Sequence, residues 1–514
     1  MLILLGVLFM ITVSMVWWVK MTTFIGWDQL ILSNNYFCNE FGISANDFVC
    51  VGMLFFCGFI ALLFSLHYFG WAESNLNILI VSFLGVMVCL IASDDYLLSL
   101  FWWEYLGVVS LFLILYYSNF DTLFAGNSTI VASRVGDVGF FLLVCYFVSG
   151  IKMAWLGLVS VCVILITKSA VVPFCSWLLE AMRAPTPVSC LVHSSTLVAA
   201  GVWFLSSYGC FLLCNNTINF LMWICLLTIF VSGFAASVFT DIKKIVALST
   251  CNNISWCFVY YLSGSPELCI CQLVCHGIGK CMLFIVIGDS LASAGGSQNK
   301  SCFTALPNNS LAGFSALSLL SISVAGFPFL GVFFTKHAML NGVFNGSGFL
   351  VTGLVLIGAF VSYTYSMRLI FLVTCPKGVN NQWLNNVYLF LSPIIVICSL
   401  FGYSLAVGLE ETSEINSFYG VFILLLNFAG VLVGYGLYSF ESTSVYYASF
   451  GYFDDVVMSI LNDFSIVGFI QSVLFNFRSE VYVVKVLGHM PSISFLRVIS
   501  IPVSIVIVMF VWLW

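Results

Sequence analysis

The chain has 514 residues, of which 62% are hydrophobic and only 7% are Asp, Glu, Lys or Arg. Soluble domains carry about a quarter charged residues, so this composition excludes an ordinary soluble protein and indicates a chain surrounded by lipid. The net charge of −6 is spread along the sequence without a basic run, which excludes nucleic acid as a partner.

Apolar stretches long enough to cross a bilayer recur along the whole chain. An α-helix needs about 20 apolar residues to cross the hydrocarbon core, and we count about fifteen such stretches, from residues 2–19 to residues 497–514. The alternating pattern of membrane β-strands is absent. We therefore predict an all-α fold, a polytopic membrane bundle of about 15 transmembrane helices.

The predicted spans fall into four parts in chain order. Residues 1–96 hold the N-terminal helices, and we expect the first span to be retained because no Arg-rich transit segment precedes it. Residues 97–440 form the core of the bundle. Residues 441–496 mix charged and apolar residues at helical spacing, which predicts a lateral amphipathic helix along the membrane surface. Residues 497–514 form a terminal transmembrane anchor. After the first span we place helices at 49–68, 78–92, 97–117, 130–149, 155–180, 188–214, 217–239, 243–263, 268–292, 311–335, 347–374, 386–408 and 418–440.

Two of these spans contain helix-breaking residues close to a lysine. Lys168 precedes Pro173, and Lys336 follows Gly326 and Pro328. A proline inside a helix frees backbone carbonyls, which a membrane protein tolerates only where protein or water satisfies them. Paired discontinuous helices indicate an ion or substrate path in transporters. The alternative is two kinked helices that only pack.

The twenty cysteines do not predict a metal site. Most lie inside apolar spans, where a free thiol behaves as a small hydrophobic group. The one cluster worth testing comprises Cys269, Cys271, Cys275 and His276. Residues two apart on a helix do not share a face, so we expect no metal there.

Ionisable residues inside the predicted spans are the strongest functional signal. Each costs several kcal/mol in a bilayer, so each is a candidate for a role in transport. The candidates are Glu104, Arg134, Asp137, Lys168, His193, Lys243, Lys244, His276, Lys280 and Lys336.

Helical spacing places some of these residues together. Arg134 and Asp137 are three apart and are predicted to form an ion pair, which has either a structural or a functional role. His276 and Lys280 are four apart and share a face, as two steps of a proton relay would. Lys244 is predicted to lie in a solvated loop. Glu104 and Lys168 have no partner nearby in sequence, so their partners must come from other helices or be each other.

The segment KSAVVPFCSWLLEAMRAPTPVSCLVHSSTLVAAG, from Lys168 to Gly201, carries a specific resemblance. It is similar to the signature of the proton-translocating membrane subunits shared by respiratory complex I and Mrp-type cation/proton antiporters. APTPVS followed by His-Ser-Ser-Thr resembles the subunit 5 branch of that family. WWEYLGVVS, SRVGDVG and DIKKIVALST match further motifs in the same order, so the resemblance covers most of residues 50–375. It implies an antiporter-like architecture of inverted repeats with residues 97–440 as the proton-translocating core, although no residue-level repeat is evident.

The resemblance implies roles for the charged residues of the first half. Glu104 and Lys168 resemble the buried glutamate–lysine couple, whose separation shifts the proton affinity of the lysine. Arg134 and Asp137 resemble an ion pair that couples neighbouring subunits.

Further roles follow for the rest of the proton path. His193 and Lys243 match polar positions of the central hydrophilic axis. His276 and Lys280 match the relay of the second half, and Lys336 matches the lysine of its broken helix.

The chain departs from the family pattern at several positions. Gln272 stands where a second histidine is usual, and His337 stands where an acid commonly follows the broken-helix lysine. Asn252, Asn253 and Ser255 replace a usual Ser-Gln and Gly. These differences concern the proton exit.

The resemblance also implies the setting. We expect a subunit of NADH:ubiquinone oxidoreductase in the mitochondrial inner membrane, or in the plasma membrane of a prokaryote, beside a neighbouring antiporter-like subunit and with cardiolipin as a lipid partner. We expect no cofactor on this chain, because FMN, the iron–sulfur clusters and ubiquinone belong to other subunits. An Mrp-type antiporter subunit is the alternative, and segment 441–496 favours complex I. A scaffold without transport would not retain such buried charges.

Overall fold

The computed structural model describes residues 45–69, 74–93, 96–149, 154–212, 215–293, 298, 311–328, 330–346, 348–374 and 417–439. Contacts divide the chain into two units, Met1–Gly451 and Tyr452–Trp514, and every described residue belongs to the first. The predicted first span, the span at 386–408, the amphipathic segment 441–496 and the anchor 497–514 lie outside the described residues.

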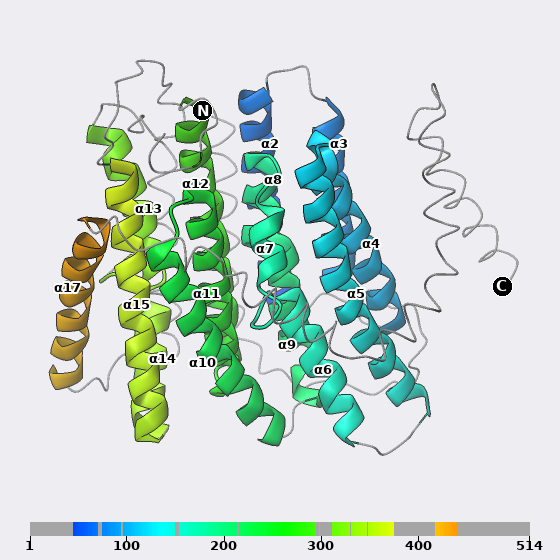
Figure 1. The fold of residues 1–514 in the computed structure, drawn as a ribbon. Coiled ribbons are helices and arrows are strands. Elements are labelled where there is room, and N and C mark those ends of the chain that lie inside the picture. Colours follow the sequence, from blue (N-terminus) through cyan, green and yellow to red (C-terminus); the bar gives the residue numbers. More distant parts are fainter. Residues whose placement is uncertain are drawn as a thin grey trace, which may run out of the picture. The chain divides into compact units, whose positions relative to one another are not determined.

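All regular elements in this described part are helices (Figure 1). Eight of the described helices are long and apolar enough to cross a membrane, and four more are apolar but shorter. The α-helices are α2 (Ala45–Phe69), α3 (Ser74–Ile91), α4 (Tyr96–Ile114), α5 (Phe120–Ser149), α6 (Ala154–Lys168), α7 (Ser176–Ala181), α8 (Thr186–Leu191), α9 (Leu197–Leu212), α10 (Asn215–Val238), α11 (Ile242–Leu262), α12 (Pro266–Ser293), α13 (Leu311–Ala325), α14 (Phe333–Gly346), α15 (Phe349–Thr374) and α17 (Ser417–Ser439). A 3₁₀ turn, η2 (Leu115–Tyr117), precedes α5, and a π-helical turn, η3 (Val192–Thr196), joins α8 to α9.

Helix α5 differs from its prediction because it begins ten residues before the expected start at residue 130. The first part of this helix is polar, which favoured a loop. In the structure the hydroxyls of Ser128, Thr129 and Ser133 donate to carbonyls three residues earlier in the helix. These side chains are therefore satisfied within the helix and do not end it.

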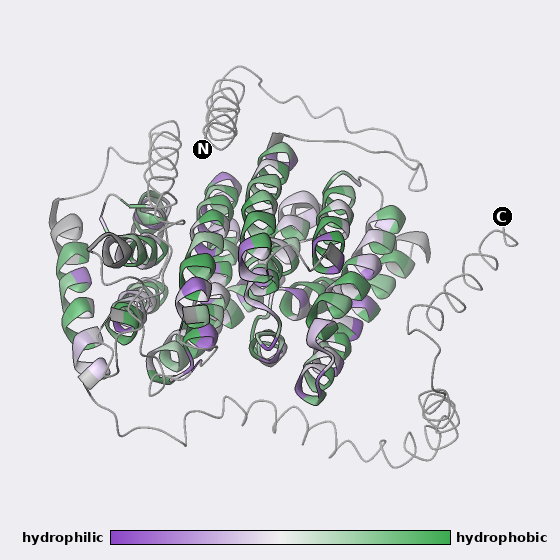
Figure 2. Ribbon diagram, turned by 90° about the horizontal axis from the view of Figure 1, so that it is seen from above, coloured by the Kyte–Doolittle hydropathy of each residue, from purple (hydrophilic) through white to green (hydrophobic). Residues whose placement is uncertain are grey.

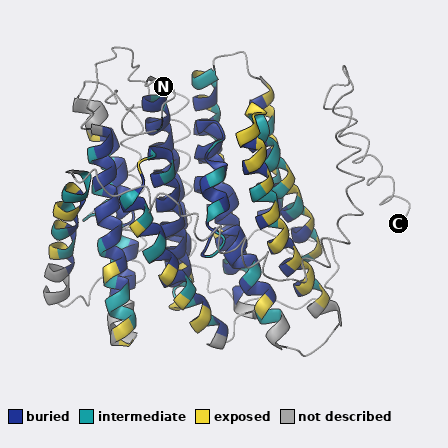
Figure 3. Cartoon of the chain, viewed as in Figure 1, coloured by how far each residue is buried: buried dark blue, intermediate teal, exposed yellow. Residues whose placement is uncertain are grey.

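Neighbouring long helices of the first unit stand side by side (Figure 1). A continuous series of packed neighbours runs from α17 through α15, α10, α11, α12, α2, α3, α4 and α5 to α6. Helix α12 also packs against α8, η3 and α13. A stretch of 18 residues is completely buried in α12 and in the span from Thr186 to Gly209, unlike in the other spans (Figure 3).

The outer helices present apolar side chains away from the bundle. Only 39% of the α4 span and 33% of the α5 span are buried, and Figure 3 shows exposed positions along both. Phe101 on α4, Val131 on α5 and Phe428 on α17 are each about half exposed or more. Seen from above, these helices are predominantly hydrophobic (Figure 2). Such a surface requires lipid or other membrane proteins around it.

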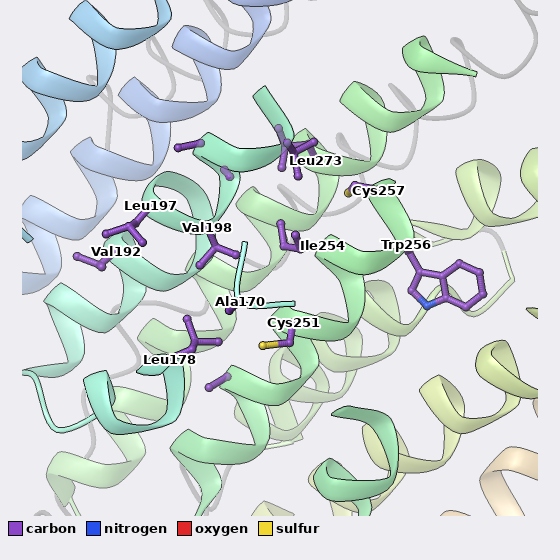
Figure 4. Packing of buried hydrophobic residues seen from close by; sticks show 14 of the residues in the cluster. Ala170, Leu178, Val192, Leu197, Val198, Cys251, Ile254, Trp256, Cys257 and Leu273 are labelled. Atoms are coloured by element: carbon purple, nitrogen blue, oxygen red, sulfur yellow. The ribbon is translucent and has the colours of Figure 1, made fainter. Parts of the chain in front are cut away.

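The interior is one large cluster of apolar side chains. Figure 4 shows Val198 of α9, Ile254 of α11 and Leu273 of α12 within it. Each of these residues is at most about 2% exposed. The polar groups described next are embedded in this apolar packing, which keeps water out except where a cavity is present.

Candidate functional site

Both predicted helix interruptions are confirmed, and a lysine lies at each. Helix α6 ends at Lys168, and the chain continues without α-helix to Ser176, with Ala170 in the left-handed region at φ 53°. Helix α13 ends at Ala325, followed by Gly326 at φ 83°, and α14 begins three residues before Lys336. A glycine suits this backbone conformation because it has no side chain.

Lys168 is 2% exposed and has few direct partners. Its Nζ lies 4.7 Å from the centroid of the Trp103 ring, a cation–π distance. Among the described residues, Nζ makes no hydrogen bond and no salt bridge. A cation buried in this way is stabilised mainly by the ring and by charges farther away.

Glu104 and Asp137 share one arginine. Arg134 Nη1 lies 3.4 Å from Asp137 Oδ2, which confirms the predicted i,i+3 ion pair, and it also contacts the Glu104 carboxylate on α4. The partner of Glu104 therefore comes from another helix, as expected, but it is Arg134 rather than Lys168. The Arg134 side chain is 53% exposed on the outer side of α5.

A small cavity connects Lys168 with His193. It is lined by both residues and by the hydroxyls of Ser110, Thr129 and Ser133, and the volume open to the centres of water molecules is about 20 Å³. One water needs about 10–15 Å³ of such space, so the cavity accommodates one. His193 lies in the π-helical turn η3, is fully buried, and neither ring nitrogen has a described hydrogen-bond partner.

In the second half the buried lysine has direct partners. Lys280 on α12 is 1% exposed, and its Nζ donates to the Val246 carbonyl at 3.1 Å and to the Ser249 hydroxyl, both on α11. His276, one turn earlier on α12, is also fully buried, so the two residues share the interior side of this helix as predicted.

A series of hydrogen bonds continues from Ser249 towards Lys336. Asn253 Nδ2 donates to the Ser249 carbonyl at 2.8 Å, and Gln272 Nε2 lies 3.5 Å from Asn253 Oδ1. Thr335 Oγ1 donates to Gln272 Oε1 at 2.5 Å. Thr335 directly precedes Lys336, so three side chains link the α11–α12 interface to the broken helix. We call Asn253, Gln272 and Thr335 the amide link.

Lys336 lies at the end of this series. Its Nζ donates to the Ala325 carbonyl at 2.6 Å and to the Ser362 hydroxyl at 3.1 Å. Ala325 is the last residue of α13, so the lysine satisfies a carbonyl that the interruption frees. Nζ also lies 5.6 Å from the Trp256 ring centroid and 5.7 Å from that of Tyr363.

Lys243 and Lys244 point to different surroundings. Lys243 is 6% exposed, and its Nζ lies 3.5 Å from the Ala184 carbonyl in the turn between α7 and α8. Lys244 forms a half-exposed salt bridge with Asp241 at 3.5 Å. The structure thus places Lys243 inside the bundle, and it places Lys244 in the first turn of α11 rather than in the predicted solvated loop.

Sequence reasoning missed several of these polar groups. Ser249, Thr335 and Ser362 were not singled out, and Asn253 and Gln272 were noted only as departures from a pattern. The available signal was the concentration of polar residues in the predicted span at 243–263. Arg368 on α15 was also missed; its guanidinium donates to the carbonyls of Ala236 and Val238 at 3.1 Å each and ties α15 to the end of α10.

The described residues contain no group of three or more His, Cys, Asp or Glu arranged to hold a metal ion.

A family model places this arrangement among known proteins. The model described as NADH:quinone oxidoreductase/Mrp antiporter, TM, matches residues 93–362, which include both interruptions and every charged residue above except Arg368. The chain belongs to the NADH:quinone oxidoreductase/Mrp antiporter family.

Curated members of this family named NADH-ubiquinone oxidoreductase chain 5 are similar over most of the chain. The protein from Caenorhabditis elegans is 32% identical over 393 residues, covering 73% of this chain and 72% of its own length. The protein from Locusta migratoria is 29% identical over 463 residues, covering 82% and 79%. The protein from Artemia franciscana is 30% identical over 397 residues, covering 72% and 71%.

Two solved structures share the antiporter-type fold. A chain of the Mrp complex from Dietzia sp. superposes with a TM-score of 0.68 at 19% identity, covering 87% of this chain and 56% of its own length. A chain of an archaeal membrane-bound sulfane sulfur reductase superposes with a TM-score of 0.58 at 18% identity, covering 76% and 83%.

Proposed function

We propose that this chain is the chain 5-type membrane subunit of a respiratory NADH:ubiquinone oxidoreductase and that it translocates protons through its buried lysines and histidines. The names of the similar proteins support the complex, and the family supports the transport activity. The mitochondrial inner membrane is the proposed location. NADH oxidation and its redox groups are assigned to other subunits.

The observation that carries the proposal is the polar series from Lys280 to Lys336, whose side chains are all buried. Each of these lysines is in direct contact with hydroxyl or carbonyl oxygens. Charged groups at this depth are expensive and are retained in membrane proteins where they carry ions or protons. A bundle that only had to pack would be more stable with apolar side chains at these positions.

The Glu104–Arg134–Asp137 group gives the first half a charge that can be moved. One arginine stabilises two carboxylates. Two unit charges ~4 Å apart interact by about 4 kcal/mol at an effective dielectric of ~20. Moving one charge across 100 mV requires about 2.3 kcal/mol. Rotation of Glu104 between Arg134 and the side of Lys168 therefore involves enough energy to load and release a proton against a membrane potential.

The exposed face of α4 and α5 is the proposed contact with the neighbouring antiporter-like subunit. Arg134 is half exposed in the middle of a membrane helix. A charge facing hydrocarbon is unfavourable, so we infer that protein covers it. The remaining apolar faces are assigned to lipid, with cardiolipin as one component.

Native electrophoresis of gently solubilised source membranes tests the assignment. We expect the chain to migrate with NADH dehydrogenase activity in one large complex. The similarity to the Mrp chain makes an Mrp-type antiporter subunit the second candidate. Migration with antiporter subunits and without that activity would replace our assignment by the second one.

A further inference from the structure

A second, larger cavity lies at one end of the bundle and is separate from the Lys168 cavity. It lies between η2, the first turn of α5, the end of α7 and the first turn of α11, and the volume open to water centres is about 250 Å³. Its polar lining includes Tyr117, Asn119, Asp121, Arg183 and Lys244. A polar cavity of this size holds several waters. We call it the polar vestibule.

Charged groups hold the vestibule open to solvent. Arg183 Nη1 lies 3.0 Å from Asp121 Oδ1, and Nη2 lies 2.9 Å from Glu180 Oε2. The Asp121 side chain is 74% exposed and that of Arg183 is 36% exposed. The Arg183–Asp121 pair joins the turn after α7 to the start of α5, so the wall of the vestibule is made of ion-paired, hydrated side chains.

The inner wall of the vestibule contacts the buried axis at one residue. Arg183 lines the vestibule, and the carbonyl of the next residue, Ala184, lies 3.5 Å from Lys243 Nζ. Lys244 also lines the vestibule, whereas its neighbour Lys243 is buried. In the first turn of α11, Lys244 therefore lines the vestibule and Lys243 lies in the buried interior.

Helix α11 continues the path inwards from Lys243. Val246 lies three residues after Lys243 and Ser249 three residues after Val246, so each lies close to one turn further along the helix. Both accept hydrogen bonds from Lys280. Along α11, the buried Lys243 beside the vestibule is thus followed by the two groups that bind Lys280, and the amide link continues from there to Lys336.

We propose that the polar vestibule is the aqueous mouth through which protons exchange between bulk water and Lys243. The inference rests on the proposed function, and it identifies where the proton path of this chain meets solvent. Its ligand is water carrying an excess proton, and Lys243 is the first buried group that the proton reaches or the last one that it leaves.

Cysteine labelling in the assembled complex tests this inference. Met182→Cys places a thiol in the vestibule wall at a position that is only 2% exposed, and Phe428→Cys places a control thiol on the apolar outer side of α17. Membrane vesicles of both orientations are treated with a charged, membrane-impermeant methanethiosulfonate, and labelled peptides are quantified by mass spectrometry. Such reagents need a hydrated, ionisable thiol, so we expect the thiol introduced by Met182→Cys to react about tenfold faster than the control thiol in one orientation.

Proton translocation is measured in the same vesicles before and after labelling. We expect labelling of M182C to lower the protons moved per NADH oxidised, and labelling of F428C to leave that ratio unchanged. Absence of labelling at M182C would overturn the hydrated vestibule. Labelling without any change in the ratio would overturn its role as the proton mouth. Lys244→Cys, which is more exposed, repeats the test if M182C does not assemble.

Failure of the proposed function gives a different result. If the chain does not translocate protons at all, the unlabelled parent complex already shows the same number of protons per NADH as a complex that lacks this subunit.

Discussion

Lys168 and Lys336 each lie at the interruption of a membrane helix, but their surroundings differ. Lys336 makes hydrogen bonds to Ala325 and Ser362 and lies near two aromatic rings. Lys168 contacts one ring and a cavity that accommodates a single water, and its nearest carboxylate cluster is bound to Arg134. The lysine of the second half is thus held by direct hydrogen bonds, whereas among the described residues the Lys168 amine has none.

The different surroundings indicate different roles for Lys168 and Lys336 in proton transfer. A lysine without fixed hydrogen bonds responds strongly to a nearby charge, because nothing else compensates for its burial. A lysine with fixed partners keeps its position while protons pass. Movement of the Glu104 charge is therefore expected to change the proton affinity of Lys168. The lysines of the second half, Lys280 and Lys336, are expected to pass the proton on.

The largest effect is expected from Lys168→Ala. Removing the amine removes the group that we propose loads the proton, so proton translocation should fall several-fold, whereas a buried, poorly satisfied cation contributes little to folding. Assembly is measured by native electrophoresis and translocation by acidification of vesicles driven by NADH. A complex that pumps normally, or one that no longer assembles, would contradict the role assigned to Lys168.

Gln272→Leu tests whether the amide link matters in the second half. Its loss removes the donor to Asn253 Oδ1, and an unsatisfied buried group costs about 1–3 kcal/mol, whereas the Thr335 hydroxyl keeps the Val332 carbonyl as an acceptor. We expect a lower thermal stability of the complex and a reduced number of protons per NADH.

Asn427→Leu is the matched control for this change. Asn427 is a buried amide on α17 whose side-chain atoms have no described partner, so its replacement should be neutral or stabilising. Equal losses for both variants would show that the amide link has no special role.

Arg134→Gln removes the cation that binds Glu104 and Asp137 and leaves Lys168 in place. Glu104 and Asp137 would then face each other without a cation between them, and their repulsion should weaken the α4–α5 contact and lower translocation by less than Lys168→Ala does. Cross-linking to the neighbouring subunit should decrease as well. Unchanged cross-linking together with unchanged translocation would contradict both the subunit contact and the charge-stabilising role proposed for Arg134.

The smallest effect is expected from His67→Gln. His67 lies at the end of α2 and contacts Asp289 at 3.4 Å in a half-exposed pair. Exposed pairs contribute about 0–1 kcal/mol, so stability and translocation should both remain close to those of the parent complex. A large loss of translocation would mean that the proton path extends to this surface.

Much of the fold was predictable because it depends on local physics. Apolar length predicted the spans, Pro173 and Gly326 predicted the interruptions, and three- and four-residue spacing predicted Arg134 with Asp137 and His276 with Lys280. The start of α5 was missed because its hydroxyls satisfy themselves within the helix, a possibility that composition does not reveal.

The contacts between helices were not predictable in the same way. That Glu104 meets Arg134, and that Gln272 meets Thr335, depends on which helices lie side by side and at what rotation. A single sequence carries no direct signal for either. Arg368 was not singled out, because its binding to the last carbonyls of α10 involves residues more than a hundred positions away.

Lys336→Ala tests the central claim most directly, because it removes the last lysine of the hydrogen-bonded series and leaves the other half intact. The measurement is the number of protons translocated per NADH oxidised, made in sealed vesicles beside His67→Gln as the control. We expect an assembled complex that oxidises NADH when uncoupled but moves fewer protons per NADH. An unchanged ratio in an assembled complex would contradict proton transfer through this polar axis.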